Sequence, residues 1–302
     1  MPITIHPVSR RRFLAGTIAA GLGTVTLPEF LMAAEVANDP HRIALLSDIH
    51  IAADPAAHER GVAMAEHLKK AVAEIEKLDP KPAAAYINGD CAYHNGLSED
   101  YQTLVKLLQP LSEGGLPIHL EMGNHDNREH LWSTIPHSEA RVEPLANRQI
   151  MILEFPRANF FLLDSLDKTN HTPGVLGDAQ IRWLAQALDG RKDKPALVFI
   201  HHQPDTRDKI EGLTDTKPLL DTLLPRRQVK ALFYGHTHVW EVAKREDLHC
   251  VNLPAVAYVF QPGQPSGWVD AHLQENGMTL ELRCIDPTHP KHGDKVELTW
   301  RA

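Results

Sequence analysis

The chain has 302 residues, 43% hydrophobic and 23% charged, which is the composition of a globular protein long enough for one large domain. Its formal net charge is −8, and this acidic balance disfavours nucleic-acid polymers as partners, because their binding proteins carry a basic stripe. The sequence shows no heptads, low-complexity tracts or internal repeats, which disfavours fibrous and solenoid architectures. We expect one compact domain that acts on small molecules.

The first 34 residues differ in character from the rest of the chain. Three arginines, Arg10 to Arg12, precede an uncharged and weakly hydrophobic stretch from Ala15 to Pro28. This pattern resembles a twin-arginine export signal. A short membrane anchor is the alternative, but the stretch is shorter than the ~20 apolar residues that span a bilayer. We therefore expect a signal peptide at 1–34, cleaved near Ala34 or Ala37, recognition by the twin-arginine export machinery, and a periplasmic or otherwise exported protein with no stable membrane span.

The remaining chain, residues 35–302, is expected to form the catalytic domain. Short apolar runs typical of buried strands alternate with helical stretches, which predicts an α/β fold. The expected strands are Ile43 to Ser47, Ala83 to Asn88, Ile118 to Met122, Phe160 to Leu163, Ala196 to Ile200 and Ala231 to Tyr234. The expected helices are Glu59 to Leu78, Ser98 to Leu108 and Ala179 to Leu188.

After Gly235 the pattern changes to short alternating strands separated by turn residues. The expected strands are Leu248 to Leu253, Ala255 to Phe260, Gly267 to Leu273, Met278 to Cys284 and Val296 to Trp300. They would form a second, largely antiparallel sheet stacked on the first within one domain.

The three cysteines are too few and too scattered for a zinc site or a disulfide framework. Oxidising surroundings would allow Cys250 to pair with Cys284, but buried free thiols are the expected state. The cysteines therefore indicate no function.

Polar residues follow five of the apolar strands, at the carboxyl ends where open α/β sheets bind ligands. The five clusters are Ser47-Asp48-Ile49-His50, Asn88-Gly89-Asp90, Gly123-Asn124-His125-Asp126, His201-His202-Gln203-Pro204 and Gly235-His236-Thr237-His238. Each alone is typical of a turn or of a hydrogen-bonded polar side chain. Together they would concentrate charge at one edge of a sheet, which a bound cation would neutralise.

The donor types in these clusters favour two transition-metal ions over one. Asp-x-His and His-x-His place alternating side chains on one face of an extended segment, so each pair converges on one centre or straddles two. Seven candidate donors exceed the needs of one ion, and with one bridging carboxylate they make two four-ligand sets. Mixed oxygen and imidazole donors suit Fe, Mn, Zn or Co rather than Ca.

The order of the five clusters resembles the signature of the calcineurin-like metallophosphoesterases, and the resemblance spans Asp48 to His238. Within that family the chain is most similar to the bacterial cyclic-nucleotide and glycerophosphodiester phosphodiesterases, a similarity supported by the run from Gly123 to Arg128 and by Leu131. The resemblance implies a four-layer α-β-β-α sandwich, in which helices flank two stacked mixed sheets. Cys91 and Gln203 depart from the family pattern, but neither departure removes a ligand.

The resemblance also implies roles for individual residues. It implies one metal site formed by Asp48, His50, Asp90 and His238, and a second formed by Asn124, His201, His236 and the bridging Asp90. His125 would be the acid or electrostatic partner beside the substrate, and Asp126 would orient His125 through a hydrogen bond. His201 is preferred to its neighbour His202 as the ligand, and His94 is a further candidate for substrate contact.

The predicted function is hydrolysis of small phosphodiesters by a hydroxide bound to two metal ions, with His125 protonating the departing alkoxide. A phosphomonoesterase or nucleotidase is the alternative enzyme, because the metal ligands do not distinguish diesters from monoesters. A non-catalytic periplasmic metal- or phosphate-binding protein is the alternative of another class.

Overall fold

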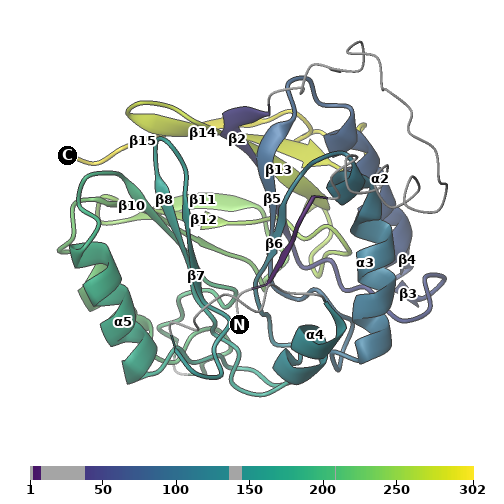
Figure 1. Cartoon of the computed structure of the whole chain (residues 1–302), viewed down its shortest axis with the longest axis horizontal. Coiled ribbons are helices and arrows are strands. Elements are labelled where there is room, and N and C mark those ends of the chain that lie inside the picture. The colour runs from purple at the N-terminus through teal and green to yellow at the C-terminus, as the bar shows by residue number, and fades with distance from the viewer. Residues whose placement is uncertain (1–2, 8–37, 136–144, 208) are drawn as a thin grey trace, which may run out of the picture.

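The computed structural model describes residues 3–7, 38–135, 145–207 and 209–302. Two mixed β-sheets stack face to face, and helices cover the outer face of each (Figure 1). This arrangement confirms the predicted α/β fold of two mixed sheets flanked by helices. The twin-arginine motif and the apolar stretch after it lie outside the described residues.

The first sheet has seven strands in the order β1-β6-β5-β2-β13-β14-β15. Strands β2, β5 and β6 are parallel, whereas β1, β13, β14 and β15 pair antiparallel with their neighbours. The bounds are β1 Ile3–Ile5, β2 Asp39–Ser47, β5 Pro82–Asn88, β6 Ile118–Leu120, β13 Gly267–Leu273, β14 Gly277–Cys284 and β15 Lys295–Thr299.

The second sheet has six strands in the order β11-β12-β10-β9-β8-β7. Its four central strands are parallel, and β11 and β7 form antiparallel edges. The bounds are β7 Met151–Glu154, β8 Asn159–Leu162, β9 Ala196–Phe199, β10 Val229–Tyr234, β11 Glu241–Arg245 and β12 Leu248–Asn252.

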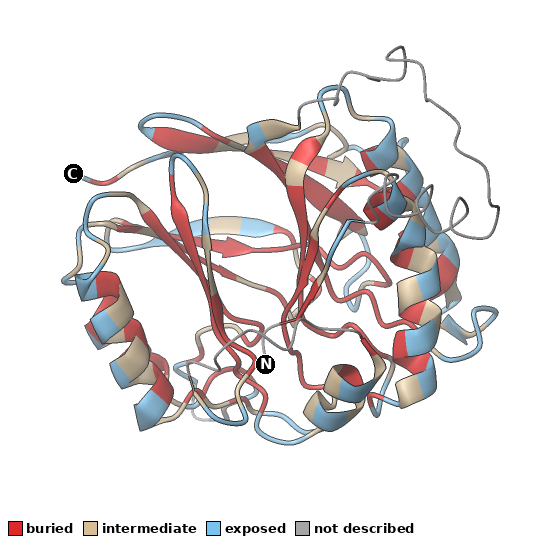
Figure 2. Cartoon of the chain, viewed as in Figure 1, coloured by how far each residue is buried: buried red, intermediate tan, exposed pale blue. Residues whose placement is uncertain are grey.

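The helices lie on opposite sides of the paired sheets, with α2 and α3 covering the first sheet and α5 and α6 the second (Figure 1). Their bounds are α2 Met64–Glu76, α3 Ser98–Glu113, α5 Asp178–Asp189 and α6 Thr216–Leu223, and a short α4 spans Arg128–Thr134. The central strands of both sheets are almost wholly buried, whereas β11 and β15 are mostly exposed and the helices bury only their inward faces (Figure 2).

Alternation along β2 explains how one strand serves two cores. Ala44 and Leu46 pack toward the first pair of helices, whereas Ile43 and Leu45 pack between the sheets against the aromatic side chains of the second sheet. Successive side chains of a strand point to opposite faces, so a strand with helices on one face and a sheet on the other is apolar on both.

Three sequence-based expectations about local structure are corrected. The C-terminal strands β13 to β15 extend the first sheet through β2 instead of forming a separate second sheet. The segment from Ala255 to Phe260 is a loop. The helix expected from Glu59 begins only at Met64, because a small hairpin of β3 (His58–Glu59) and β4 (Val62–Ala63) precedes it.

Strand β1 lies inside the segment predicted to be a signal peptide. Ile3 to Ile5 pair with β6 at the edge of the first sheet, and the side chain of Ile3 is fully buried. Cleavage near Ala34 would remove this strand and leave one side of the three-residue β6 unpaired. Among the described residues, no helix is both long and apolar enough to cross a bilayer.

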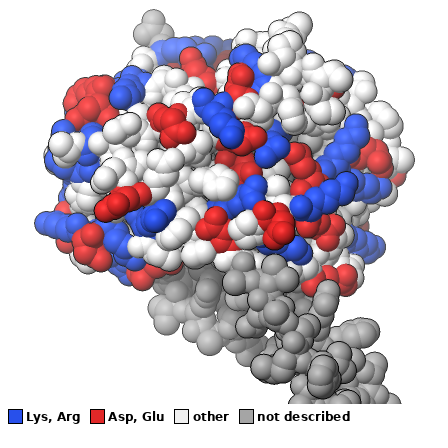
Figure 3. Space-filling model, turned by 90° about the horizontal axis from the view of Figure 1, so that it is seen from above, with Lys and Arg blue, Asp and Glu red and all other residues white. Residues whose placement is uncertain are grey.

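The surface agrees with the mixed charge of the sequence. On the face drawn in Figure 3, Lys and Arg are interspersed with Asp and Glu, and neither sign forms a continuous stripe. This face therefore lacks the continuous basic stripe that is typical of nucleic-acid-binding proteins.

Candidate metal centre

The predicted site residues meet where parallel strands of both sheets end. Asp48, Asp90 and Asn124 follow β2, β5 and β6 of the first sheet, and His201 and His236 follow β9 and β10 of the second. Because the two sheets stack, the carboxyl ends of both sets of strands meet at one edge. Residues up to 190 positions apart in the sequence, Asp48 and His238, thereby come within ion-pair distance.

Five of the seven candidate ligands occupy the left-handed region of backbone space. The φ angles are 51° at Asp48, 46° at His50, 46° at Asp90, 69° at His236 and 55° at His238. Residues with a Cβ adopt this conformation at an energetic cost, and such strain gathers at functional sites. Each sharp corner turns a side chain from the end of its strand toward the shared centre.

Two glycines allow the loops to approach closely enough. A Cβ on Gly123 would lie 2.1 Å from Oδ1 of Asp90, and a Cβ on Gly235 would lie 2.1 Å from Oγ of Ser47 and 2.5 Å from Oδ2 of Asp48. Either contact is far inside van der Waals distance. The glycines that precede Asn124 and His236 are therefore required by the packing of one loop against the carboxylate of another.

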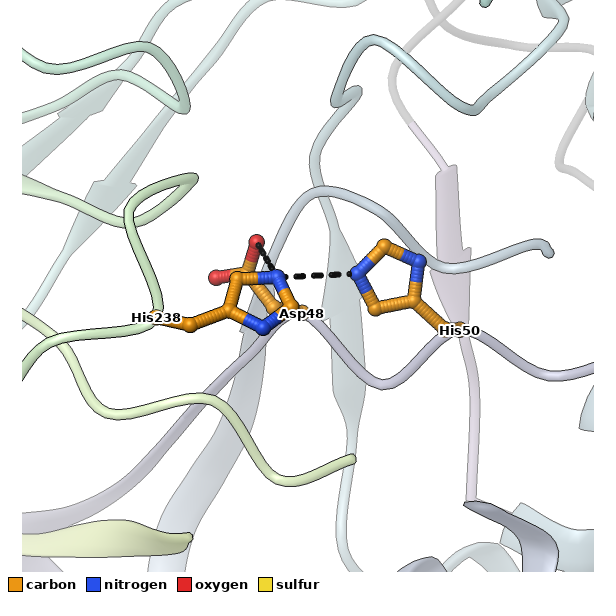
Figure 4. A group of neighbouring side chains, drawn as sticks. All are labelled: Asp48, His50 and His238. Carbon is orange, nitrogen blue, oxygen red and sulfur yellow. Dashed lines mark hydrogen bonds and ion pairs between the residues drawn. The ribbon is translucent and has the colours of Figure 1, made fainter. Parts of the chain in front are cut away.

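Three overlapping groups of side chains have geometry suited to holding a metal ion. They are Asp48 with His50 and His238, His50 with Asp90 and His125, and Asp90 with His201 and His236, and the ligand atoms within each group lie within 4.8 Å of one another. Figure 4 shows the first group, in which both histidine rings and the carboxylate point toward a common centre. Asp90 and His50 each belong to two of the groups, and Asp90 is the one carboxylate that does.

Backbone carbonyls set the orientation of two histidines. Nδ1 of His238 donates to the carbonyl oxygen of Tyr258 at 2.5 Å, and Nδ1 of His201 donates to that of Asn88 at 2.9 Å. Each bond directs Nε2 of the same ring into the site, 3.4 Å from Oδ1 of Asp48 for His238 and 3.4 Å from Oδ2 of Asp90 for His201. This is the arrangement expected of histidines that bind metal through Nε2.

The charges of the site call for a cation. Asp48 and Asp90 are buried, and within the described residues neither forms an ion pair with Lys or Arg. A neutral His201 or His238 would direct the lone pair of its Nε2 at a carboxylate oxygen. Only a proton or a metal ion between the two atoms removes the repulsion between them. Nε2 of His201 and Oδ1 of Asn124 are buried without hydrogen-bond partners, as free ligand atoms would be.

The pKa shifts point in the same direction. Desolvation lowers the pKa of His50 to about 3 and that of His236 to about 4, so both imidazoles are neutral at pH 7 and able to bind metal. Desolvation also opposes protonation of His201, but Asp90 and Asp48 outweigh it and raise the pKa of His201 to about 10. A metal ion in the site would take the place of that proton.

Geometry distinguishes His201 from His202. Nε2 of both rings is buried without a hydrogen-bond partner, but that of His201 points at Asp90, whereas His202 is turned so that its Nδ1 lies 2.8 Å from Oγ of Ser165. His202 is absent from the three groups found among the described residues, and its ring packs against that of His236 at 4.8 Å. The structure therefore favours His201 as the ligand and His202 as a neighbour that packs against the ligands.

The predicted role of Asp126 is wrong in one respect. Asp126 does not orient the ring of His125: its carboxylate accepts bonds from the backbone nitrogens of Cys91, Ala92 and Gly123, and from the hydroxyl of Tyr101. These bonds tie the loop after β5 to the loop after β6. Desolvation, with Asp90 next, raises the pKa of Asp126 to about 6.

A backbone carbonyl orients His125 instead. Nδ1 of His125 donates to the carbonyl oxygen of His94 at 3.0 Å, and the backbone nitrogen of His125 donates to Oδ1 of Asp90 at 2.9 Å. The His125 ring lies 5.2 Å from that of His50 and 5.5 Å from that of His94. The main-chain carbonyl of His94, the candidate for substrate contact, thus positions His125, while the ring of His94 is exposed.

Sequence reasoning missed several residues around the site. Tyr258 stacks on His50 at 5.0 Å, and Phe260 stacks on His238 at 4.2 Å, although both were assigned to a strand. Tyr101 was read only as part of a helix. Glu121, which lies in the expected strand Ile118 to Met122, is buried with neither carboxylate oxygen hydrogen-bonded, and burial raises its pKa well above the ordinary value. Only the aromatic pair two residues apart offered a signal in the sequence.

Comparison with known proteins identifies relatives of the whole fold. The family model described as calcineurin-like phosphoesterase matches residues 41–240. A 3′,5′-cyclic adenosine monophosphate phosphodiesterase of Pseudomonas aeruginosa is 29% identical over 230 residues, which cover 74% of this chain and 79% of that protein. A protein of Arcobacter nitrofigilis, named a probable glycerophosphodiester phosphodiesterase, is 28% identical over 275 residues, covering 84% of this chain and 97% of that protein.

A solved structure shares the same architecture. The crystal structure of a dimetal phosphatase from Danio rerio matches with a TM-score of 0.67 at 16% identity, and the match covers 87% of this chain and 100% of that one. This likeness supports the layered fold described above.

Proposed function

The chain belongs to the calcineurin-like phosphoesterase family, and we propose that it is a dinuclear metal-dependent hydrolase of small phosphodiesters. The family relationship and the groups of potential ligands make it a metal-dependent phosphoesterase. The observation that carries the dinuclear proposal is that two of the three groups share Asp90. Preference for diesters is supported by the names of its relatives, a cyclic-nucleotide and a glycerophosphodiester phosphodiesterase.

The ligand sets proposed are those that the geometry brings together. Asp48, His50, Asp90 and His238 would hold one ion, and Asn124, His201, His236 and Asp90 the other. When bound, such ions lower the pKa of water to ~7 and stabilise charge on phosphoryl oxygens. The contacts do not distinguish among Fe, Mn, Zn and Co as the two metal ions, because all four accept oxygen and imidazole ligands.

His125 is proposed as the proton donor to the leaving group. Its Nδ1 hydrogen is engaged with the carbonyl oxygen of His94, so in the imidazolium form Nε2 carries the second proton, on the side of the ring away from that carbonyl. From there the proton passes to the departing alkoxide oxygen, and the neutral imidazole remains. The bond to His94 keeps the ring in this orientation in both protonation states.

A panel of four substrates tests the proposal. Metal-loaded protein is incubated with bis(p-nitrophenyl) phosphate, p-nitrophenyl phosphate, cyclic AMP and glycerophosphocholine. We expect the diesters to be hydrolysed faster than the monoester. Faster monoester hydrolysis would instead identify a phosphomonoesterase or nucleotidase, and inertness toward all four with metals bound would identify a non-catalytic binding protein.

We also propose that the protein is exported to the periplasm through its twin-arginine motif. The support is the sequence pattern alone, Arg10 and Arg11 before an uncharged stretch. Changing both arginines to lysine is expected to retain the protein in the cytoplasm, as measured by cell fractionation. Undiminished periplasmic protein would show that another signal or route is used.

A further inference from the structure

An aromatic surface leads from the metal ligands to solvent. Tyr258 stacks on His50 with ring centroids 5.0 Å apart, and Phe260 stacks on His238 at 4.2 Å. Tyr258 and Phe260 contact each other edge to face at 5.8 Å. Tyr258 is buried, but Phe260 is 47% exposed, so the outer end of this surface is open to a ligand.

Arg60 covers part of the exposed ring. Its guanidinium carbon lies 4.9 Å from the centroid of Phe260. Arg60 is at the tip of the β3–β4 hairpin, where it and Gly61 have φ angles of 52° and 80°. The hairpin is anchored because the hydroxyl of Tyr93 donates to Glu59 at 2.7 Å.

The charge of Arg60 is not otherwise used. Among the residues that the structure describes, no carboxylate forms an ion pair with Arg60, and its recorded contact is with the Phe260 ring. A single exposed Phe is ordinary on a protein surface. Phe260 differs from such a residue in two ways. An unpaired guanidinium lies over its face, and only one imidazole ring separates it from the candidate metal site.

We propose that Phe260 and Arg60 bind the planar base of a nucleotide diester whose phosphate lies at the metal centre. The inference rests on the proposed function, because it supplies the substrate class for the same site. Bases stack on aromatic rings and on guanidinium planes. Because His238 stacks on Phe260 and the Arg60 guanidinium lies over the same ring, the base would stack on the guanidinium plane and contact the exposed part of Phe260. Stacking depends little on base identity, so we expect several cyclic nucleotides to be accepted, with all of them preferred to alkyl diesters.

The test compares two diesters that differ in the base. Cyclic AMP carries adenine, and glycerophosphoglycerol carries neither a ring nor a second charge. Phe260→Ala is expected to lower kcat/KM for cyclic AMP about tenfold and to change kcat/KM for glycerophosphoglycerol less than about twofold, as losing one stacked base predicts. Phe260→Tyr, which keeps the ring, is expected to retain most of the activity. Leu97→Ala is the matched control, because Leu97 is a large apolar side chain as exposed as Phe260, at 46% against 47%.

Arg60 is tested by two replacements. Arg60→Lys keeps the charge but loses the plane, so stacking predicts that it weakens cyclic AMP hydrolysis nearly as much as Arg60→Ala. Simple attraction of the phosphate predicts instead that Arg60→Lys is close to wild type for both diesters. The second result would overturn the stacking role of Arg60.

Two results would overturn the role of Phe260. An equal loss with both diesters would show that Phe260 only supports the His238 ring, and an unchanged rate with cyclic AMP would show no contact with the base. Should the metal-loaded wild type hydrolyse neither diester, calorimetric binding of AMP and of glycerol 3-phosphate still decides. The base site predicts about tenfold weaker AMP binding in Phe260→Ala with unchanged glycerol 3-phosphate binding, and equal changes reject it.

Discussion

The two sheets contribute different chemistry to the metal centre. The first sheet supplies both carboxylates, the Asn124 amide and His50, whereas the second supplies only imidazoles, His201, His236 and His238. Two of the three ligand groups combine residues from both sheets. Asp90, the carboxylate that belongs to two of the groups, comes from the first sheet. The two side chains that belong to more than one group, Asp90 and His50, both come from the first sheet, so replacements there should affect more of the centre than replacements in the second sheet.

Replacing Asp90 is expected to have the largest effect on the metal centre. Asp90→Ala removes the one carboxylate that belongs to two groups, so we expect loss of both ions and a fall in activity exceeding the ~10–100-fold typical of losing an outer partner. Asn124→Ala should weaken only one ion. Elemental analysis after dialysis measures both variants. Two tightly bound ions in Asp90→Ala would reject the bridging role.

His125 tests a group that lies wholly on the first sheet. A p-nitrophenolate group departs without protonation, while a ribose or glycerol alkoxide needs a proton. We therefore expect His125→Ala to slow alkyl diesters by ~10²–10⁴-fold and p-nitrophenyl diesters much less, with metal content unchanged. Steady-state kinetics on both substrate types decides. The same factor for both types would mean that His125 stabilises phosphoryl charge and transfers no proton.

An ion pair inside the first sheet separates scaffold from site. Arg42 donates from Nε and Nη2 to the two carboxylate oxygens of Asp270, at 2.9 and 2.6 Å, and Asp270 is fully buried. Asp270→Asn leaves a buried guanidinium without its partner, and we expect the free energy of unfolding to fall by about 3 kcal/mol. Urea denaturation measures the loss. Metal content should stay at the wild-type level, and its disappearance would show that this pair supports the site directly.

The same pair predicts a dependence on pH. Desolvation opposes ionisation of Asp270, but the bond from Arg42 outweighs it and holds the pKa of Asp270 below its ordinary value of 3.8. A carboxyl group with a lowered folded-state pKa contributes stability above its unfolded pKa and loses that contribution as pH falls through the folded value. The stability difference between wild type and Asp270→Asn should thus be constant above about pH 5 and shrink below about pH 4. A difference that grows toward low pH would contradict this assignment.

The smallest effect is expected at Tyr101. Its hydroxyl donates to Asp126 at 3.0 Å and accepts from the backbone nitrogen of Asn127 at 2.8 Å, inside the packing of α3 against the site loops. Tyr101→Phe removes both bonds without changing the ring, which should cost about 1–2 kcal/mol of unfolding free energy. Activity per folded molecule should fall only slightly, because three backbone bonds to Asp126 remain. A large loss of metal would show that Tyr101 alone fixes the loop.

Local sequence patterns predicted the central strands well because each is a short apolar run with a polar residue at its carboxyl end. The candidate ligands share that signal, which is why Asp48, Asp90 and His236 could be selected from the sequence and are brought together by the fold. The membership of β13 to β15 in the first sheet was missed, because strand order depends on long-range pairing with β2 that no local pattern records. The hairpin before Met64 was missed because its apolar spacing also fits a helix.

The surroundings of the site were less predictable than its ligands. The hydrogen-bond partners of Asp126 and His125 depend on loop geometry. The sequence therefore suggested that these two neighbours bind each other, whereas in the structure each binds other residues. The position of Phe260 beside the site was missed for a related reason. Its alternation with Tyr258 indicates a strand whether or not a partner strand exists. Both errors arise where backbone direction is set by tertiary contacts.

Left-handed backbone at Asp48 and Asp90 limits the evolutionary routes open to this sequence. Asn and Gly tolerate that conformation far better than β-branched residues, so most replacements at these corners disturb the fold as well as the chemistry. Asparagine preserves the turn and the shape while discarding the charge. A descendant that abandons catalysis is therefore expected to pass through asparagine at these corners, and to survive as a folded relic that has lost its metals.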